Sequence, residues 1–175
     1  MGYTHYFKFR KPVSQIDNGN NLFKHAVDAT KDCIARLPKR IPFTVYNWDR
    51  VALKSNKVVK RVSLRLGDGL GEHEPIFRND LIQFNGWAAK GYDHEPFSIN
   101  VNDTLSDSCK TVQNPYDVAV CIALLCFKFY FGDDFEFRSD GSIEAGDAGW
   151  KLAKRVTEKY FMEECHKTTA FRNAL

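Results

Sequence analysis

An unbroken apolar run over residues 118–127 constrains the fold of this chain more than any other segment. Asn114, Pro115 and Asp117 precede it, and these residue types favour the cap, the first position and the first turn of a helix. Because the helix that follows is apolar on every side, we expect it to lie in the centre of the protein. The run is far shorter than the roughly 20 residues that cross a bilayer, so no membrane span is expected.

Alternation of apolar and polar residues predicts strands before and after this helix. Over residues 3–10 one face carries Tyr3, His5, Phe7 and Phe9, which predicts a strand that begins almost at the first residue. The same pattern predicts strands over 58–66, ending near 84, over 97–101 and over 135–138. Two further helices are predicted, one from about 18–21 to Pro38 and one that Asp147 caps.

These elements predict an α+β protein with a mainly antiparallel sheet packed by about three helices. A chain of 175 residues is long enough for one well-buried core and short for two. We therefore expect a single domain over residues 1–165, followed by a polar C-terminal tail over 166–175.

Charge and composition narrow the classes of partner. The net charge is only +3, and proteins that bind nucleic acid usually have a larger or more clustered basic excess, so we expect no nucleic-acid partner. A basic group occurs at Lys54, Lys57, Lys60, Arg61 and Arg65, and it fits either a solvated face or an anion site. An anionic small molecule needs only two or three such residues, and the aromatic content of 14% can build a stacking pocket.

Cysteine and histidine spacing predicts no metal and no cofactor. The five cysteines form no Cys-x-x-Cys pair, and no secretory signal opens the chain, so we expect a reduced cytoplasmic protein. His73 and His94 each begin a His-Glu-Pro sequence, but neither is followed by the second histidine of a His-Glu-x-x-His zinc motif.

Two clusters are candidate contacts for an anionic ligand. Lys110 and Thr111 lie just before the capped helix, where an ammonium, a hydroxyl and free amides suit a phosphate; the alternative is an exposed loop. Tyr116 in its first turn could stack or donate. At the N-terminus Tyr3, His5 and Tyr6 could contact a base or ribose; the alternative is a strand that packs its rings on the core. Asn85 could add polar recognition. All of these residues must converge for one site to exist.

A catalytic alternative uses other residues. Cys109 could be a nucleophile with His94 or His5 as its base, and a general base could be assisted by Asp117, Asp133 or Asp134. A nucleophilic cysteine needs a depressed pKa and a positioned base, and the sequence shows neither. We therefore expect no catalytic residue.

Several segments resemble a widespread family of small, uncharacterised phage and bacterial proteins. That family typically opens with Gly-Tyr-Thr-His-Tyr and an aromatic residue, as residues 2–7 do here. Further matching segments are Phe84-Asn85-Gly86, His94-Glu95, Cys109-Lys110-Thr111, residues 115–121, residues 131–135 and Ser139-Asp140-Gly141. This chain differs in its 87–93 loop and at 112–114, where the relatives look more basic.

The resemblance implies a phage or prophage origin, and small phage proteins often counter host defence. Some resemble oligomeric sponges that sequester nucleotide-derived immune signals. We therefore expect non-catalytic binding of a small anionic, nucleotide-like molecule in the bacterial cytoplasm, with a homo-oligomer left open. The alternatives are a hydrolase or transferase acting on such a molecule, and an inhibitor that covers a host defence protein.

Overall fold

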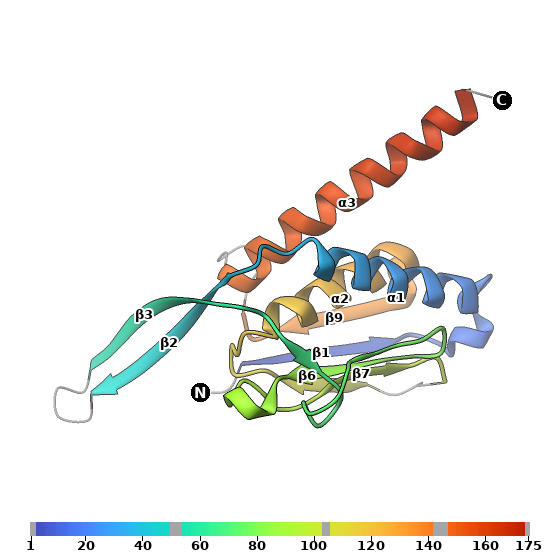
Figure 1. Cartoon of the computed structure of the whole chain (residues 1–175). Helices are drawn as coiled ribbons and strands as arrows, with labels where there is room; N and C mark the ends of the chain where they lie inside the picture. Colours follow the sequence, from blue (N-terminus) through green and yellow to red (C-terminus); the bar gives the residue numbers. More distant parts are fainter. Residues whose placement is uncertain (1–2, 50–53, 103–105, 142–146, 174–175) are drawn as a thin grey trace.

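The computed structural model describes residues 3–49, 54–102, 106–141 and 147–173. In this part of the chain, α-helices pack on antiparallel sheets, which confirms the predicted α+β class. Figure 1 shows the helices α1 and α2 on one side of the strands β1 and β9, with β6 and β7 below these strands. No helix among the described residues is long and apolar enough to cross a membrane.

The N-terminal strand is the middle strand of the first sheet. β1 (Thr4–Phe9) pairs with β8 (Asp107–Lys110) on one side and with β9 (Phe135–Ser139) on the other, both antiparallel. The predicted alternation is confirmed, because every second residue of β1 is buried. This register places His5 between Cys109 and Ser139, on the face that meets the helices.

The second sheet is built around β6 (Leu81–Gly86). β7 (Phe97–Asn100) pairs with β6, as do β4 (Leu66–Gly67) and β5 (Ile76–Phe77), all antiparallel. β2 (Ile41–Asp49) and β3 (Lys54–Val62) form a hairpin that extends away from the body (Figure 1). The strand predicted over 58–66 is thus divided, because its first part pairs with β2 and its last residue with β6.

Helix α2 (Asp117–Phe131) is the centre of the core, as predicted. It packs between α1 (Gly19–Ala35) and α3 (Ala148–Asn173), and 11 of its 15 residues are buried. Aromatic rings join it to its neighbours: Phe127 meets Phe23 of α1 at 5.2 Å between ring centroids and Phe9 of β1 at 6.3 Å. Gly132 ends the helix with a φ of 52°.

Two helix ends differ from the prediction. Asn114 was expected to cap α2, but the helix begins at Asp117, and the Asn114 side chain instead donates to the Asp93 carbonyl at 3.0 Å. α3 continues through the predicted polar tail to Asn173, because no proline or glycine follows Gly149. Short 3-10 turns complete the described elements at Val13–Gln15, Ala88–Lys90 and Gly132–Asp134.

Candidate functional site

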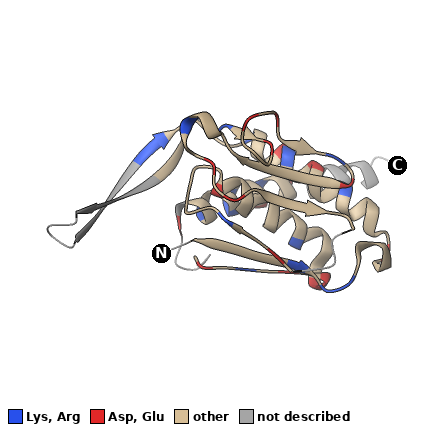
Figure 2. Ribbon diagram, turned by 90° about the horizontal axis from the view of Figure 1, so that it is seen from below, with Lys and Arg blue, Asp and Glu red and all other residues tan. Residues whose placement is uncertain are grey.

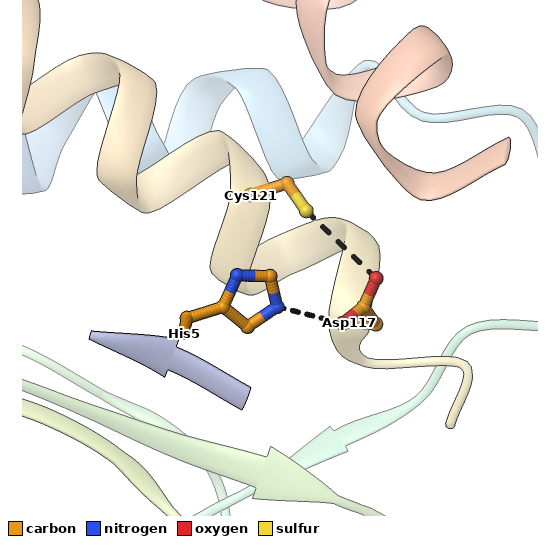
Figure 3. Close-up of side chains that lie close together, drawn as sticks. All are labelled: His5, Asp117 and Cys121. Atoms are coloured by element: carbon orange, nitrogen blue, oxygen red, sulfur yellow. Dashed lines mark hydrogen bonds and ion pairs between the residues drawn. The ribbon is translucent and has the colours of Figure 1, made fainter. Parts of the chain in front are cut away.

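A buried polar cluster joins the N-terminal strand to the central helix. His5 of β1 and Cys121 of α2 are fully buried, and Asp117 at the start of α2 is 7% exposed. Figure 3 shows the three side chains turned toward one another across the strand–helix interface. The inward face of β1 supplies the imidazole, and the spacing of four residues places Asp117 and Cys121 on one helix face.

The Asp117 carboxylate is the acceptor at the centre of the cluster. Its Oδ1 atom accepts hydrogen bonds from His5 Nε2, at 2.8 Å, and from the Thr111 hydroxyl. The Cys121 thiol lies 3.8 Å from Oδ2. Since a carboxylate only accepts, Nε2 carries the imidazole proton. The first turn of α2 also favours this negative charge, because the helix amides point toward it.

A second carboxylate lies on the α3 side of the cluster. Tyr3 donates its hydroxyl to Asp147 Oδ2 at 3.1 Å. Burial raises the pKa of Tyr3 well above its ordinary value, and the negative charge of Asp117 raises it further. Burial likewise raises the pKa of Cys121, with Asp117 adding to the effect. Tyr3 and Cys121 therefore stay neutral beside the carboxylates.

A strained turn presents Thr111 to this cluster. Val112 has a φ of 46° and Gln113 a φ of 59°, in the left-handed region that β-branched residues disfavour. The Thr111 amide donates to the Tyr3 carbonyl at 2.9 Å, and the Gln113 amide donates to the Thr111 hydroxyl at 3.3 Å. These bonds hold the turn in place, so the hydroxyl is directed at Asp117.

The predicted ligand residues are divided between several places. Tyr3, His5 and Thr111 meet in the buried cluster, whereas the buried Tyr116 donates its hydroxyl to the Glu95 carbonyl at 2.7 Å. Lys110 lies on β8, where its backbone amide donates to the Glu95 carboxylate at 2.8 Å. The Tyr116 hydroxyl and the Lys110 backbone therefore both bind Glu95.

Asn85 and Tyr6 lie elsewhere. The Asn85 amide group is bonded to backbone groups of Gly69, Gly86 and His94, so it fixes the loops around β6. Tyr6 lies on the other face of β1 and lines a hollow of about 350 Å³, where the Arg138 guanidinium covers its ring at 4.5 Å. That hollow has mixed charge, because Lys8 and Arg138 share it with Asp107 and Glu136.

The catalytic alternative gains no support from the placement of its residues. Cys109 is buried, its thiol donates to the Glu95 carbonyl at 3.3 Å, and burial raises its pKa. Such a thiol is a poor nucleophile. Asp133 and Asp134 pair with Lys128 and Lys11 at 3.5 Å and 3.4 Å, on the turn after α2.

A hollow of about 400 Å³ at the end of α1 has a different character. It lies between that helix end, residues 64–66 and residues 74–77, and the basic side chains on it are Lys31, Lys39 and Arg65, against one acidic residue, Glu74. Its other lining residues are apolar: Ile34, Ala35, Leu37, Pro38, Leu64, Leu66, Pro75 and Phe77. We call the apolar lining residues the floor of this hollow, and Lys31, Lys39 and Arg65 its basic rim.

Neighbouring residues add to the positive charge at this end of the molecule. Arg65 stacks on the Trp87 ring, with its guanidinium 3.4 Å from the ring centroid. Arg40 donates to the Arg61 carbonyl at 2.7 Å, at the point where the β2–β3 hairpin joins the body. Figure 2 shows basic segments at this junction. In the sequence, only the basic group around Arg65 indicated this region. That Lys31 and Lys39 lie close to Arg65 could not be read from the sequence.

No protein-family model, curated protein or solved structure matches this chain. The buried cluster and the basic hollow are the two candidate sites of this protein.

Proposed function

We propose that this protein binds and sequesters a small anionic, nucleotide-like molecule without converting it, at the basic hollow beside the end of α1. The observation that carries the proposal is the combination of Lys31, Lys39 and Arg65 with an apolar floor in one hollow of about 400 Å³. That volume lies within the range of about 300–1,000 Å³ that is usual for small-molecule sites.

The charges of this rim favour an anion. Among the described residues, neither Lys31 nor Lys39 forms an ion pair, so both ammonium groups have donors free for a ligand. Arg65 is held by its contact with Trp87, which leaves guanidinium donors for bidentate contact with a phosphate or carboxylate. With Glu74 as the one acidic lining residue, the rim carries a net positive charge.

The floor of the hollow favours a ligand with an apolar or aromatic body. Phe77 is half-buried and stacks on Phe84, with ring centroids 6.1 Å apart. Leu37 and Pro38 also line the hollow. A nucleobase has both the π-face and the size to lie there while its phosphates meet the basic rim.

Binding without turnover fits the lining better than catalysis does. No His, Cys or Ser lines the hollow among the described residues, and Glu74 is the one carboxylate on it. If the protein comes from a phage, as the resemblance implies, it would act as a sponge for an immune signal. An oligomer would place several hollows in one assembly.

The proposal is tested by native mass spectrometry of the purified protein with a nucleotide extract from infected, defence-active cells. The retained compound is released by heat and identified, and the extract is analysed for consumed compounds. We expect an intact anionic compound that the double variant Lys31→Ala, Arg65→Ala no longer retains. The control is Lys24→Ala, on the same helix, where the lysine already pairs with Asp28 at 2.5 Å.

Each other outcome contradicts the proposal in a distinct way. A consumed compound and a released product would make the protein a hydrolase or transferase. Retention that survives the double variant would move the site away from this hollow. If nothing is retained and nothing is consumed, the remaining candidate is an inhibitor of a host defence protein, which a pull-down from the host would test.

A further inference from the structure

We propose that the His5, Asp117 and Cys121 side chains form a Zn²⁺ site that fastens β1 to α2. This inference goes beyond the anion binding proposed above and does not depend on it. The observation is that one ligand atom of each side chain lies within 4.8 Å of the other two, and all three residues are buried. The three come from two elements that the core already packs together (Figure 3).

The ligand chemistry fits zinc. An imidazole nitrogen, a carboxylate oxygen and a thiolate sulfur are the three donor types that Zn²⁺ takes from proteins, at about 2.0–2.3 Å. His5 Nε2 lies 2.8 Å from Asp117 Oδ1, and Cys121 Sγ lies 3.8 Å from Asp117 Oδ2. Ligand atoms around a tetrahedral zinc ion are about 3.3–3.8 Å apart, so His5 and Asp117 need to separate by about half an ångström to admit the ion. Calcium and magnesium are disfavoured, because they take oxygen ligands.

The charges of the cluster also favour a dication. A neutral imidazole, a carboxylate and a thiolate around Zn²⁺ sum to zero, which is the balance that a buried site requires. Without the ion, the buried Asp117 charge faces a neutral thiol and a second carboxylate, Asp147, near Tyr3. The cluster therefore has an excess of negative potential.

Among the described residues, no hydrogen bond holds the other imidazole nitrogen of His5, so the imidazole proton can move to it. His5 is fully buried, and its Nδ1 atom has no hydrogen-bond partner in the described part of the chain. Buried polar atoms without partners are rare in native proteins. The geometry assigns the Zn²⁺ bond to Nε2, because Nε2 is the nitrogen that faces Asp117 at 2.8 Å, and Nδ1 is left to carry the imidazole proton.

Zinc binding moves the imidazole proton of His5 from Nε2 to Nδ1 and removes one proton from Cys121. The Cys121 thiol loses its proton to solvent as the zinc–sulfur bond forms, so affinity must fall as the pH falls. The Thr111 hydroxyl, bonded to Asp117 Oδ1, orients the carboxylate as outer partners of metal ligands do. These three side chains leave one tetrahedral position for a further ligand.

The test uses Co²⁺ as a spectroscopic substitute on full-length protein freed of metal by a chelator. We expect one Co²⁺ per chain with a thiolate-to-cobalt charge-transfer band in the near ultraviolet. Zn²⁺ should displace the Co²⁺, abolish the band and raise the Tm. Cys121→Ser should lose the band, whereas Cys126→Ser should keep it, because Cys126 is an equally buried cysteine of the same helix.

The result that overturns the proposal is a folded wild-type protein without the band, or a band that persists in Cys121→Ser. Circular dichroism shows whether each variant is folded. If a variant unfolds, X-ray absorption of the Zn²⁺-loaded wild-type protein decides. One sulfur neighbour with nitrogen or oxygen ligands supports the site, and zinc without a sulfur neighbour refutes it.

Discussion

The His5 imidazole and the Asp117 carboxylate lie 2.8 Å apart, although 112 residues separate them in the chain. One belongs to the N-terminal strand and the other opens the central helix. The rings of Tyr3 and Trp150 pack against the imidazole, at 5.4 Å and 5.6 Å between centroids. The hydrogen bond thus connects the start of the chain to the centre of the core.

Removing the Asp117 carboxylate should destabilise the protein strongly. In Asp117→Ala, His5, Thr111 and Cys121 lose a shared buried acceptor, and each buried donor left unsatisfied costs about 1–3 kcal/mol. Urea unfolding in the presence of a chelator measures the free energy of unfolding. The control Asp133→Ala removes an exposed carboxylate and should change it by less than about 0.5 kcal/mol. Equal effects of the two variants would contradict the central role of Asp117.

Gly149 should not tolerate a side chain. A Cβ atom at this position would lie 2.7 Å from Asp117 Oδ2, so the first turn of α3 is held against the carboxylate. An exposed glycine in a helix usually gains about 0.5–1 kcal/mol on replacement by alanine. Here we expect Gly149→Ala to lose about 1–3 kcal/mol through the clash. Because the two effects have opposite signs, a stabilised variant in thermal unfolding would show that the contact is absent.

Tyr3 should make stability depend on alkaline pH. Burial first, and then the charge of Asp117, raise the pKa of its phenol in the folded state. The folded protein therefore holds this proton more tightly, and the stabilisation is complete below about pH 10 and lost as the pH rises above it. Urea unfolding between about pH 8 and 11 should show a shallower loss for Tyr3→Phe than for wild type. Parallel losses would rule out the coupling.

The turn beside the cluster stores strain that glycine can relieve. Val112 has a φ of 46° and is partly exposed, so its side chain contributes little packing to offset the strain. We expect Val112→Gly to raise the free energy of unfolding by about 1 kcal/mol. Val112→Ala retains a Cβ atom at the same φ and should gain less. A destabilised Val112→Gly would show that the Val112 side chain matters more than the backbone strain.

Ligand affinity should depend on the basic rim and on salt. Once the retained compound is known, Lys31→Ala and Arg65→Ala should each weaken its binding about tenfold, or about 1.4 kcal/mol. Higher ionic strength should weaken wild-type binding too, because exposed charges are screened. Isothermal titration calorimetry measures both effects, with Lys24→Ala as the unchanged control. Affinity that is independent of salt would argue against charge recognition at this hollow.

Much of the fold was readable because patterning along the chain is local. The alternation of β1 and the apolar run of α2 predicted a buried strand face and a central helix, and both are confirmed. β2, β5 and β8 were not predicted, since the apolar residues of β2 fall on both faces and strands of two and four residues show too little alternation to be recognised. The start of α2 was placed too early, because Asn114 found a partner in Asp93 rather than in the helix amides.

The candidate sites were less readable than the fold. The sequence indicated Tyr3, His5 and Thr111 as ligand contacts, and the structure brings them together near Asp117. From the sequence, Asp117 was a candidate only for assisting a general base. Cys121 looked like a small core residue within an apolar run. Its position one turn after Asp117 was visible, but the approach of His5 was not.

The sequence by itself therefore determined the elements and their buried faces, since periodicity is a property of neighbouring residues. It also determined the modest positive charge and the cysteines without metal-type spacing. Only the tertiary structure decided that His5 meets Asp117 and that Lys31 shares a hollow with Arg65. The reason is physical: such meetings depend on how strands and helices pack across the core, and packing brings together residues whose separation along the chain carries no signal.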